Sequence, residues 1–202
     1  SNLIIRDRGI PGIVIKLGKN FSKIKFAKNS ISVGAGCIDS YVAKISAKNG
    51  IDLSFLRTIP GNIGGAVTMN AGCYGSYVSD YFLSLRIICR NGAIKILRLE
   101  DLDFRYRGSS IPDNAIVTEV TFKSIKEEPE NIAMKMNRAL EYRELHQPVK
   151  ELSCGSTFRN PLGRSSSMDP GDTDHSLKAW KLIDEAGLRG MKVGGAQIST
   201  KH

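Results

Sequence analysis

A glycine-rich segment at residues 58–75 is the part of the sequence best suited to holding a phosphate-bearing ligand. It reads TIPGNIGGAVTMNAGCYG, with five glycines and no charged side chain. Glycine lets the backbone approach a ligand closely, and its N–H groups can face phosphate oxygens. A helix beginning at Asn62-Ile63 would add a favourable dipole for a diphosphate. The segment is not a Walker motif, because no Gly-Lys-Ser/Thr closes it, and it is not the dinucleotide fingerprint of a βαβ unit, because no predicted parallel core strand precedes it. A buried glycine-rich turn is therefore the alternative interpretation.

Two further stretches carry side chains that could take part in catalysis. In FRYRGSS at 104–110, Arg105 and Arg107 alternate with Tyr106. If this is a strand, the arginines share one face and could bind a carboxylate or phosphate, although a solvated basic edge strand is the alternative. In SCGSTFRNP at 153–161, a serine follows a glycine, but G-x-S-x-G is absent and no activating base is obvious. A hydrolase triad is therefore disfavoured, and a turn with a capping serine is the simpler interpretation.

Short strands and a few helices must position these stretches. Strands are predicted where β-branched and apolar residues gather, at residues 3–5, 13–17, 31–33, 83–89, 93–99 and 115–122. Helices are predicted where apolar residues recur at helical spacing, at about 38–48, 130–145 and 177–186. Asn91-Gly92 between two of the strands is a strong hairpin signal. Strand-rich sequence followed by helix-rich sequence predicts an α+β fold in two parts, divided near residue 125.

Positive charge is concentrated in the first half of the chain. The 202 residues include 29 Lys and Arg against 20 Asp and Glu, a net charge of +9, and residues 1–100 carry the whole excess. An anionic partner is therefore expected there, with nucleic acid, a phosphorylated ligand or a membrane surface as candidates. The four cysteines and three histidines are widely spaced. We therefore expect reduced thiols in a cytoplasmic protein and no metal site.

Taken together, the motifs resemble those of the UDP-N-acetylenolpyruvoylglucosamine reductases (UDP-N-acetylmuramate dehydrogenases, MurB) of bacterial peptidoglycan synthesis. The resemblance follows the family's order along essentially the whole chain. Its motifs are SNL and RD near the start, SFLRTIPGNIGGAVTMNAGCYG at 54–75, F-x-Y-R-x-S at 104–109, YRELHQP at 142–148, GSTFRNP at 155–161, KLIDEAGLRG at 181–190 and VGGAQISTKH at 193–202. The stretch 142–161 lacks the longer insertion of one family branch, so the chain resembles the shorter type.

The resemblance implies both a fold and a reaction. Residues 1–125 would form a FAD-binding domain of the PCMH/vanillyl-alcohol-oxidase type, and residues 126–202 a smaller α+β substrate-binding domain. The family uses NADPH and FAD to reduce UDP-N-acetylglucosamine enolpyruvate to UDP-N-acetylmuramate. FAD carries the hydride, while the protein supplies placement and electrostatics. The partners expected are the UDP-sugar and NADPH, with no nucleic acid, no membrane, and the monomer favoured.

The resemblance also assigns roles to single residues. Arg107 corresponds to the arginine that stabilises charge developing on the substrate, and Ser156 to the serine that protonates the intermediate. Positions matching the substrate-binding residues are Arg143, Gln147 and Asn160, the first two near the UDP diphosphate. Positions matching the FAD-contacting stretches are Ser1, Asn2, Pro60, Gly61, Asn62, Ile63, Gly64, Gly65, Asn70, Gly72, Tyr74 and Gly75, with Gly65 and Tyr74 nearest the reacting end.

Two departures from the family and two rival hypotheses accompany this interpretation. The upstream glycines of the phosphate loop would precede Ser1, and the third catalytic residue, a glutamate, would lie beyond His202. We therefore expect an internal segment of a longer enzyme. One rival is a basic, non-catalytic binding module, for example one that binds nucleic acid. The sequence does not favour it, because the chain lacks interleaved aromatic residues and a recognition motif for nucleic acid. The other is a flavin oxidase of the same fold superfamily. The fold alone would not distinguish an oxidase from a reductase, but the motifs that contain Ser156 and Arg107 favour the reductase. The loop 162–176 has no assigned role.

Overall fold

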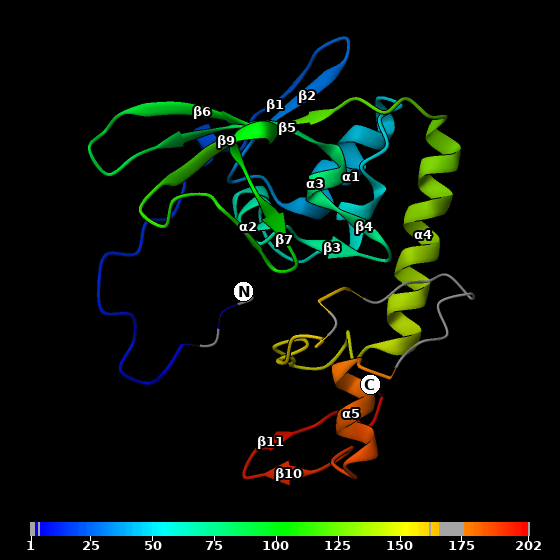
Figure 1. The fold of residues 1–202 in the computed structure, drawn as a ribbon. Coiled ribbons are helices and arrows are strands. Elements are labelled where there is room, and N and C mark those ends of the chain that lie inside the picture. Colours follow the sequence, from blue (N-terminus) through cyan, green and yellow to red (C-terminus); the bar gives the residue numbers. More distant parts are fainter. Residues whose placement is uncertain (1–2, 4, 162, 166–175, 202) are drawn as a thin grey trace.

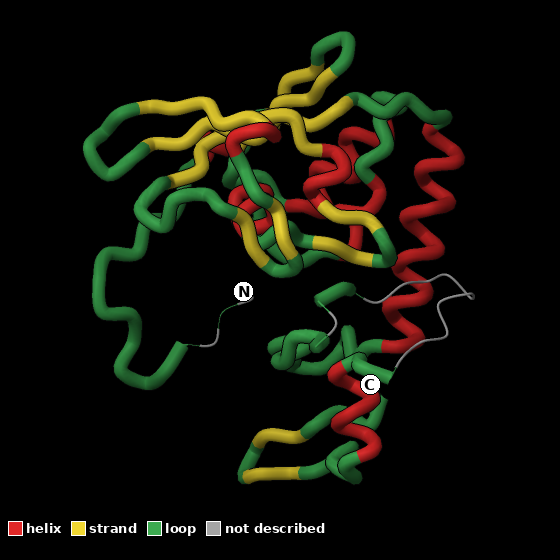
Figure 2. The backbone as a smooth tube through the Cα atoms, in the orientation of Figure 1, coloured by secondary structure: helices red, strands yellow, loops and turns green. Residues whose placement is uncertain are grey.

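The computed structural model describes residues 3, 5–161, 163–165 and 176–201 (Figures 1 and 2). Its helices are α1 (Asp39–Lys48), α2 (Ile63–Thr68), α3 (Val78–Tyr81), α4 (Pro129–His146) and α5 (Ala179–Glu185), with 3-10 turns η1 (Lys19–Phe21), η2 (Ser54–Thr58) and η3 (Leu99–Asp101). Its strands are β1 (Ile24–Phe26), β2 (Ser30–Gly34), β3 (Gly72–Cys73), β4 (Ser76–Tyr77), β5 (Phe82–Ile88), β6 (Ile94–Arg98), β7 (Phe104–Arg105), β8 (Gly108–Ser109), β9 (Ile116–Lys123), β10 (Lys192–Val193) and β11 (Ala196–Gln197). The mixture of helices and strands confirms the α+β class.

An antiparallel five-stranded sheet, in the order β1-β2-β9-β5-β6, frames the first part of the chain. Helices α1 and α2 lie against one of its faces (Figure 1). On β2 and β9, Val33 and Val120 are paired and fully buried toward this helical layer. Their neighbours Ser32 and Thr121 point to the opposite face and share a hydroxyl hydrogen bond of 3.1 Å. At β2 and β9 the sheet therefore has one apolar face and one polar face, as expected for an antiparallel sheet with a single helical layer.

Several sequence-based predictions of these elements are confirmed. Residues 83–89 and 93–99 form the predicted antiparallel hairpin as β5 and β6, with Gly92 at φ 81° in its turn. Strand β2 contains the predicted 31–33, and β9 covers the predicted 115–122 apart from its first residue. Helix α1 stops at Asn49, and Gly50 takes a left-handed φ of 63°, which glycine adopts without steric cost.

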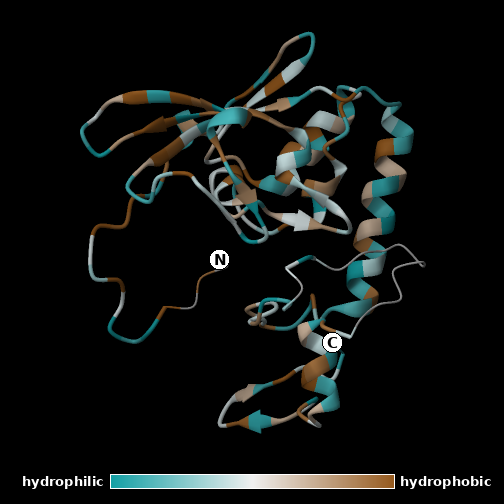
Figure 3. Cartoon of the chain, viewed as in Figure 1, coloured by the Kyte–Doolittle hydropathy of each residue, from teal (hydrophilic) through white to brown (hydrophobic). Residues whose placement is uncertain are grey.

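The strands predicted at 3–5 and 13–17 are not found among the described residues. Residue 4 lies outside the described part, and residues 13–17 run as an irregular segment (the blue chain in Figure 1). Ile13 is 92% exposed, and hydrophobic stretches of this segment lie away from the sheet (Figure 3). A strand needs a neighbouring strand to pair its backbone. Local β-branched composition was therefore insufficient to predict one here.

Helix α4 extends the packed core beyond the predicted division near residue 125. Ile132 and Met136 belong to the same buried cluster as the sheet, and α4 packs against η2 and α1. Lys135, on the same helix, donates to the carboxylates of Asp52 (2.7 Å) and Glu127 (2.5 Å). Asp52 is almost fully buried and accepts the N–H of Ser54 at the start of η2. The first half of α4 therefore packs with, and is ion-paired to, the part of the chain that forms the five-stranded sheet and its helices.

We expect Lys135→Met to lower the free energy of unfolding by about 1–3 kcal/mol, because the buried Asp52 carboxylate loses its cationic partner. Burial alone would raise the pKa of Asp52, but hydrogen bonds from Lys135 and Ser54 outweigh it and lower this pKa. The stabilisation is therefore present above the carboxyl's ordinary pKa and is lost as the pH falls through the lowered value. Urea unfolding at pH 7 measures the loss of unfolding free energy in Lys135→Met. The same experiment in strong acid shows whether the stabilisation by this ion pair has been lost. The exposed Lys126→Met is the control, and an equal loss in both variants would contradict the assignment.

The C-terminal part consists of α5 and the β10–β11 hairpin. Helix α5 forms within the predicted span and is followed by Gly187 at φ 72°, as predicted. No residue of α5 is fully buried, and on the apolar face predicted for 177–186 Trp180 and Ile183 are partly buried whereas Leu177 is exposed. Most of the loop 162–176 lies outside the described residues. Within the described part of the chain, none of the helices has the length and apolar character needed to cross a bilayer.

Candidate active site

The glycine-rich segment is fastened to the loop that joins β2 to α1. The backbone N–H groups of Ile63 and Gly64 donate to the carbonyls of Cys37 (3.0 Å) and Ala35 (2.9 Å). The Asn62 side chain donates to the Gly36 carbonyl at 2.7 Å. Helix α2 therefore begins where predicted, but two N–H groups of its first turn are already paired within the protein. They do not support the diphosphate site expected at this helix end.

The glycines of this segment fall into two groups. A Cβ added at Gly64 would lie 3.1 Å from Ala35 Cβ, and one at Gly72 would lie 2.2 Å from the Tyr77 ring, so these two permit close packing inside the protein. A Cβ added at Gly65 or Gly75 would meet no atom within 4 Å. Both are exposed, so a ligand can lie directly on bare backbone at these positions. Of the remaining predicted positions, Gly61 and Pro60 are exposed.

Tyr74 and Cys73 lie at the β3–β4 hairpin beside two arginines. Burial raises the pKa of the Tyr74 hydroxyl, and its ring meets Tyr142 of α4 edge-on, with centroids 5.3 Å apart. Burial also raises the pKa of Cys73, whereas a hydrogen bond from Thr58 and the charges of Arg143 and Arg107 act in the opposite direction. The two arginines therefore lie close enough to act electrostatically on the same thiol.

Arg107 lies in the turn of a short hairpin, which corrects the prediction of an alternating strand at 104–110. Strands β7 and β8 pair Arg105 with Gly108, leaving Tyr106 and Arg107 as the two turn residues. Arg107 has φ 56°, and its guanidinium lies 5.3 Å from the centroid of the Tyr106 ring. Because Arg105 and Arg107 are on different parts of a hairpin, they do not share a strand face.

Among the described residues, the non-glycine residues with positive φ are Asn70 (40°), Tyr74 (53°) and Arg107 (56°). All three belong to the motifs singled out from the sequence. Left-handed backbone is costly for residues with a Cβ and is tolerated best by asparagine. Such strain tends to gather at functional sites, so it supports placing the candidate site at these residues.

Arg143 connects α4 to the start of the glycine-rich segment. Its Nη1 donates to the Thr58 carbonyl at 2.7 Å, and its Nε donates to Gln147 Oε1 at 3.2 Å. Thr58 directly precedes the segment Ile59-Pro60-Gly61. Arg143 and Gln147 therefore form a connected pair beside Cys73 and Tyr74, and part of the Arg143 guanidinium is occupied by a structural bond.

Asn160 organises the loop that precedes α5. Its Oδ1 accepts the backbone N–H of Ala179 (3.1 Å), the first residue of the helix, and its Nδ2 donates to the Arg164 carbonyl (2.7 Å). The Tyr106 hydroxyl accepts the Asn160 N–H at 3.3 Å. Lys178, 2% exposed, donates to the Ser165 carbonyl at 3.1 Å. This cluster joins the Arg107 hairpin to the C-terminal part.

Ser156 is exposed on an irregular stretch between Gly155 and Thr157. No hydrogen bond of its hydroxyl, to Arg107 or to any other side chain, is found among the described residues. Ser1 and Asn2, also predicted to bind the cofactor, lie outside the described residues.

Asp39, at the first position of α1, is a buried carboxyl that sequence reasoning missed. It is 1% exposed, and neither carboxylate oxygen finds a hydrogen-bond partner among the described residues. Its backbone N–H donates to the Gly61 carbonyl at 3.1 Å. Burial raises the pKa of Asp39 to about 7. No sequence signal distinguishes this aspartate from an ordinary first-turn acid.

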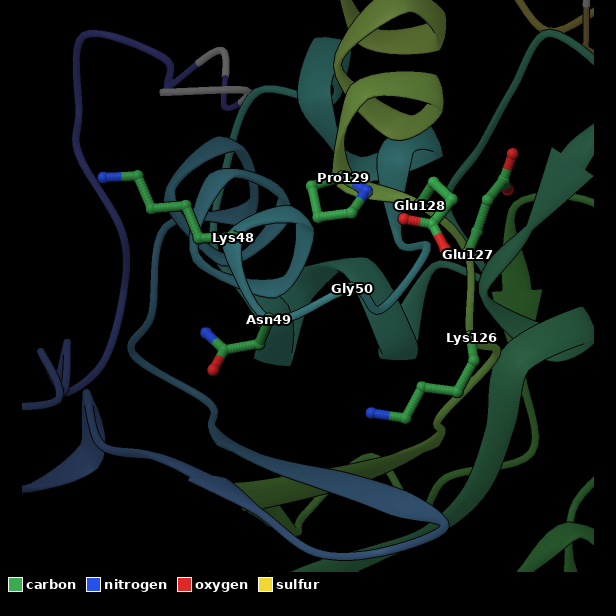
Figure 4. A pocket seen from close by; sticks show the side chains of 7 residues that line it. All are labelled: Lys48, Asn49, Gly50, Lys126, Glu127, Glu128 and Pro129. Carbon is green, nitrogen blue, oxygen red and sulfur yellow. The ribbon is translucent and has the colours of Figure 1, made fainter.

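A separate hollow of about 560 Å³ lies between the C-terminal end of α1 and the N-terminal end of α4 (Figure 4). Lys48, Asn49, Lys126 and Glu128 are among its lining residues. It lies at the end of α4 opposite Arg143 and therefore plays no part in the candidate site.

Family models match both parts of the chain. Residues 1–98 match the model described as FAD binding domain, and residues 147–202 match the model described as UDP-N-acetylenolpyruvoylglucosamine reductase, C-terminal domain. These ranges contain the glycine-rich segment and the Ser156 stretch respectively.

Curated relatives and a solved structure carry the same name. The UDP-N-acetylenolpyruvoylglucosamine reductases of Ruegeria pomeroyi and Paracoccus denitrificans are 49% and 50% identical over the whole chain. The chain spans 65% of the length of the first and 66% of the second. The crystal structure of UDP-N-acetylenolpyruvylglucosamine reductase (MurB) from Thermus caldophilus matches with a TM-score of 0.80 and 34% identity, covering 96% of this chain and 66% of that one.

Proposed function

Because the chain belongs to the UDP-N-acetylenolpyruvoylglucosamine reductase family, we propose that the protein is a FAD-dependent reductase of peptidoglycan synthesis. It takes electrons from NADPH and reduces UDP-N-acetylglucosamine enolpyruvate to UDP-N-acetylmuramate in the cytoplasm. The observation that carries this proposal is the convergence of strained Tyr74 and Arg107 with Arg143 beside the glycine-rich segment. That combination provides cationic groups next to an open stretch of bare backbone.

The described residues fit FAD. Gly65 and Gly75 leave open space where a side chain would stand, so a flat, extended ligand can lie against the backbone. Asn62 and Gly64 hydrogen-bond to the carbonyls of Gly36 and Ala35. These bonds fix the glycine-rich stretch to the β2–α1 loop and so keep the space beside Gly65 open. When bound, FAD supplies the hydride carrier that no side chain of this protein can replace.

The side chains have distinct parts in the proposed chemistry. Hydride addition to the β-carbon of an enol ether carboxylate places negative charge on the α-carbon and its carboxylate. The Arg107 guanidinium, held by its hairpin turn, stabilises this charge. The Ser156 hydroxyl delivers a proton to the α-carbon, which is basic enough to take it from a positioned alcohol. Arg143 and Gln147 bind the diphosphate of the UDP-sugar, and Asn160 shapes the adjoining loop.

The direct test uses the natural full-length protein. A flavin absorbance spectrum that is bleached by NADPH and restored anaerobically by the enolpyruvyl UDP-sugar is the expected result. Salt-sensitive binding to generic DNA with no retained flavin would support the basic binding module instead. Restoration of the absorbance by oxygen but not by the UDP-sugar would favour an oxidase.

We expect Arg107→Ala to lower kcat/KM for the UDP-sugar about 100-fold, because one cationic stabiliser of the developing charge is removed. The control is Arg105→Ala on the same hairpin, whose exposed side chain should be replaceable with a change of about twofold or less. Steady-state kinetics of the two variants measure the difference. Equal losses would show that the hairpin's net charge matters, and not the placement of Arg107.

A further inference from the structure

Ser109, the last residue of the F-x-Y-R-x-S motif, has a structural contact that points to a role in the proposed reaction. Its hydroxyl donates to the backbone carbonyl of Thr68 at 2.8 Å. Thr68 is the last residue of α2, and the carbonyls at a helix C-terminus have no partner within the helix. The bond therefore attaches β8 of the Arg107 hairpin to the end of the helix formed by the glycine-rich segment.

A second contact attaches the other strand of the same hairpin. Asn70 Nδ2 donates to the Arg105 carbonyl over a longer 3.4 Å, while Asn70 Oδ1 accepts the N–H of Ser79 at 3.0 Å. Asn70 is 5% exposed and has φ 40°. Both ends of its amide are thus used by protein atoms, which leaves the side chain engaged in holding β7 and α3.

The hairpin needs these attachments because it is very small. Its strands have two residues each, and short isolated hairpins are marginally stable. Its turn also holds Arg107 in a left-handed conformation that is costly for arginine. External bonds to both strands, one from Ser109 to Thr68 and one from Asn70 to Arg105, can keep the turn in this conformation.

We propose that Ser109, supported by Asn70, is a positioning residue that locks the Arg107 hairpin onto α2 and so sets the catalytic arginine relative to the glycine-rich segment. This inference rests on the proposed function for its kinetic consequence, but the attachment itself does not. In this proposal the last serine of the motif acts by positioning Arg107, and it does not need to contact the substrate itself.

The test compares Ser109→Ala and Ser109→Thr in the natural full-length protein with FAD bound. Ser109→Ala removes the bond to Thr68, whereas Ser109→Thr keeps the hydroxyl. We expect amide hydrogen exchange of peptides spanning 104–110 to become about fivefold faster in Ser109→Ala and to return toward the unchanged protein in Ser109→Thr. After anaerobic reduction with dithionite, we expect reoxidation by the enolpyruvyl UDP-sugar to slow about tenfold in Ser109→Ala only.

Ser32→Ala is the matched control, because it also removes a single hydroxyl hydrogen bond, to Thr121, on the polar face of the sheet. It should change neither readout. Unchanged exchange at 104–110 in Ser109→Ala would overturn the inference even if the protein had no reductase activity. Faster exchange with an unchanged reoxidation rate in an active enzyme would overturn the positioning role. Absence of turnover in the unsubstituted protein would instead count against the proposed function, while the exchange result would still decide the attachment.

Discussion

Replacing Ser156 with alanine should lower the rate of product formation about 10³-fold, while bleaching of the flavin absorbance by NADPH stays within about twofold. The hydroxyl is the proposed proton donor to the substrate α-carbon and has no part in taking electrons from NADPH. Ser156 is exposed, and its hydroxyl has no hydrogen bond among the described residues. Its loss should therefore leave the folded structure and the thermal midpoint unchanged. Anaerobic stopped-flow absorbance separates the two half-reactions.

Ser153→Ala provides the control for this prediction, since Ser153 lies on the same exposed stretch and its hydroxyl accepts the N–H of Gly155 at 3.1 Å. If loop conformation alone mattered, Ser153→Ala would slow product formation as much as Ser156→Ala. Normal product formation by Ser156→Ala would remove Ser156 from the proposed mechanism altogether.

The elements that sequence predicted correctly are those specified by local signals. Helix α1 follows from apolar spacing and the stop at Asn49-Gly50, and the β5–β6 hairpin follows from Asn91-Gly92. Helix α4 begins at Pro129, whose missing N–H costs nothing in a first turn. In each case the deciding residues are neighbours in the chain, so pattern alone is informative.

The elements that sequence missed depend on partners distant in the chain. The apolar stretch 13–17 has strand composition but pairs with no strand in the described structure. The alternation at 104–110 predicts a strand, whereas the structure has a two-residue turn at Tyr106-Arg107, whose neighbours Ser109 and Arg105 bond to Thr68 and Asn70. These contacts join residues 35 and 41 positions apart, which no local pattern reports.

The candidate site shows the same division. The glycine-rich segment and Arg107 were identified by their motifs, but which glycines face outward could not be read from the sequence. Gly64 and Gly65 are adjacent and chemically identical, yet only Gly64 packs against Ala35. Similarly, the resemblance placed Arg143 beside a diphosphate, while its bond to the Thr58 carbonyl needs α4 and η2 to be packed together.

Asp39 gives the structure an expected dependence on pH. Its carboxyl is buried without a hydrogen-bond partner among the described residues, and burial raises its pKa to about 7 from an ordinary value of 3.8. The Cys37 side chain, whose pKa burial also raises, can carry no positive charge and therefore cannot offset the charge of this carboxylate. The folded state therefore holds the Asp39 proton more tightly than the unfolded chain does. Stability is full below about pH 4 and falls as the pH rises to about 7.

We expect Asp39→Asn to raise the free energy of unfolding at pH 8 by roughly 4 kcal/mol at most, since about three pKa units separate the folded and unfolded carboxyl. The amide has nearly the same shape and cannot ionise, so the gain should shrink toward zero near pH 4. Urea unfolding of the natural full-length protein across this range measures it. The exposed Asp113→Asn should leave the pH dependence unchanged. If Asp39→Asn instead destabilises the protein at pH 8, the charged carboxylate must have a favourable partner in the full-length fold, and burial would then not be the dominant influence on its pKa.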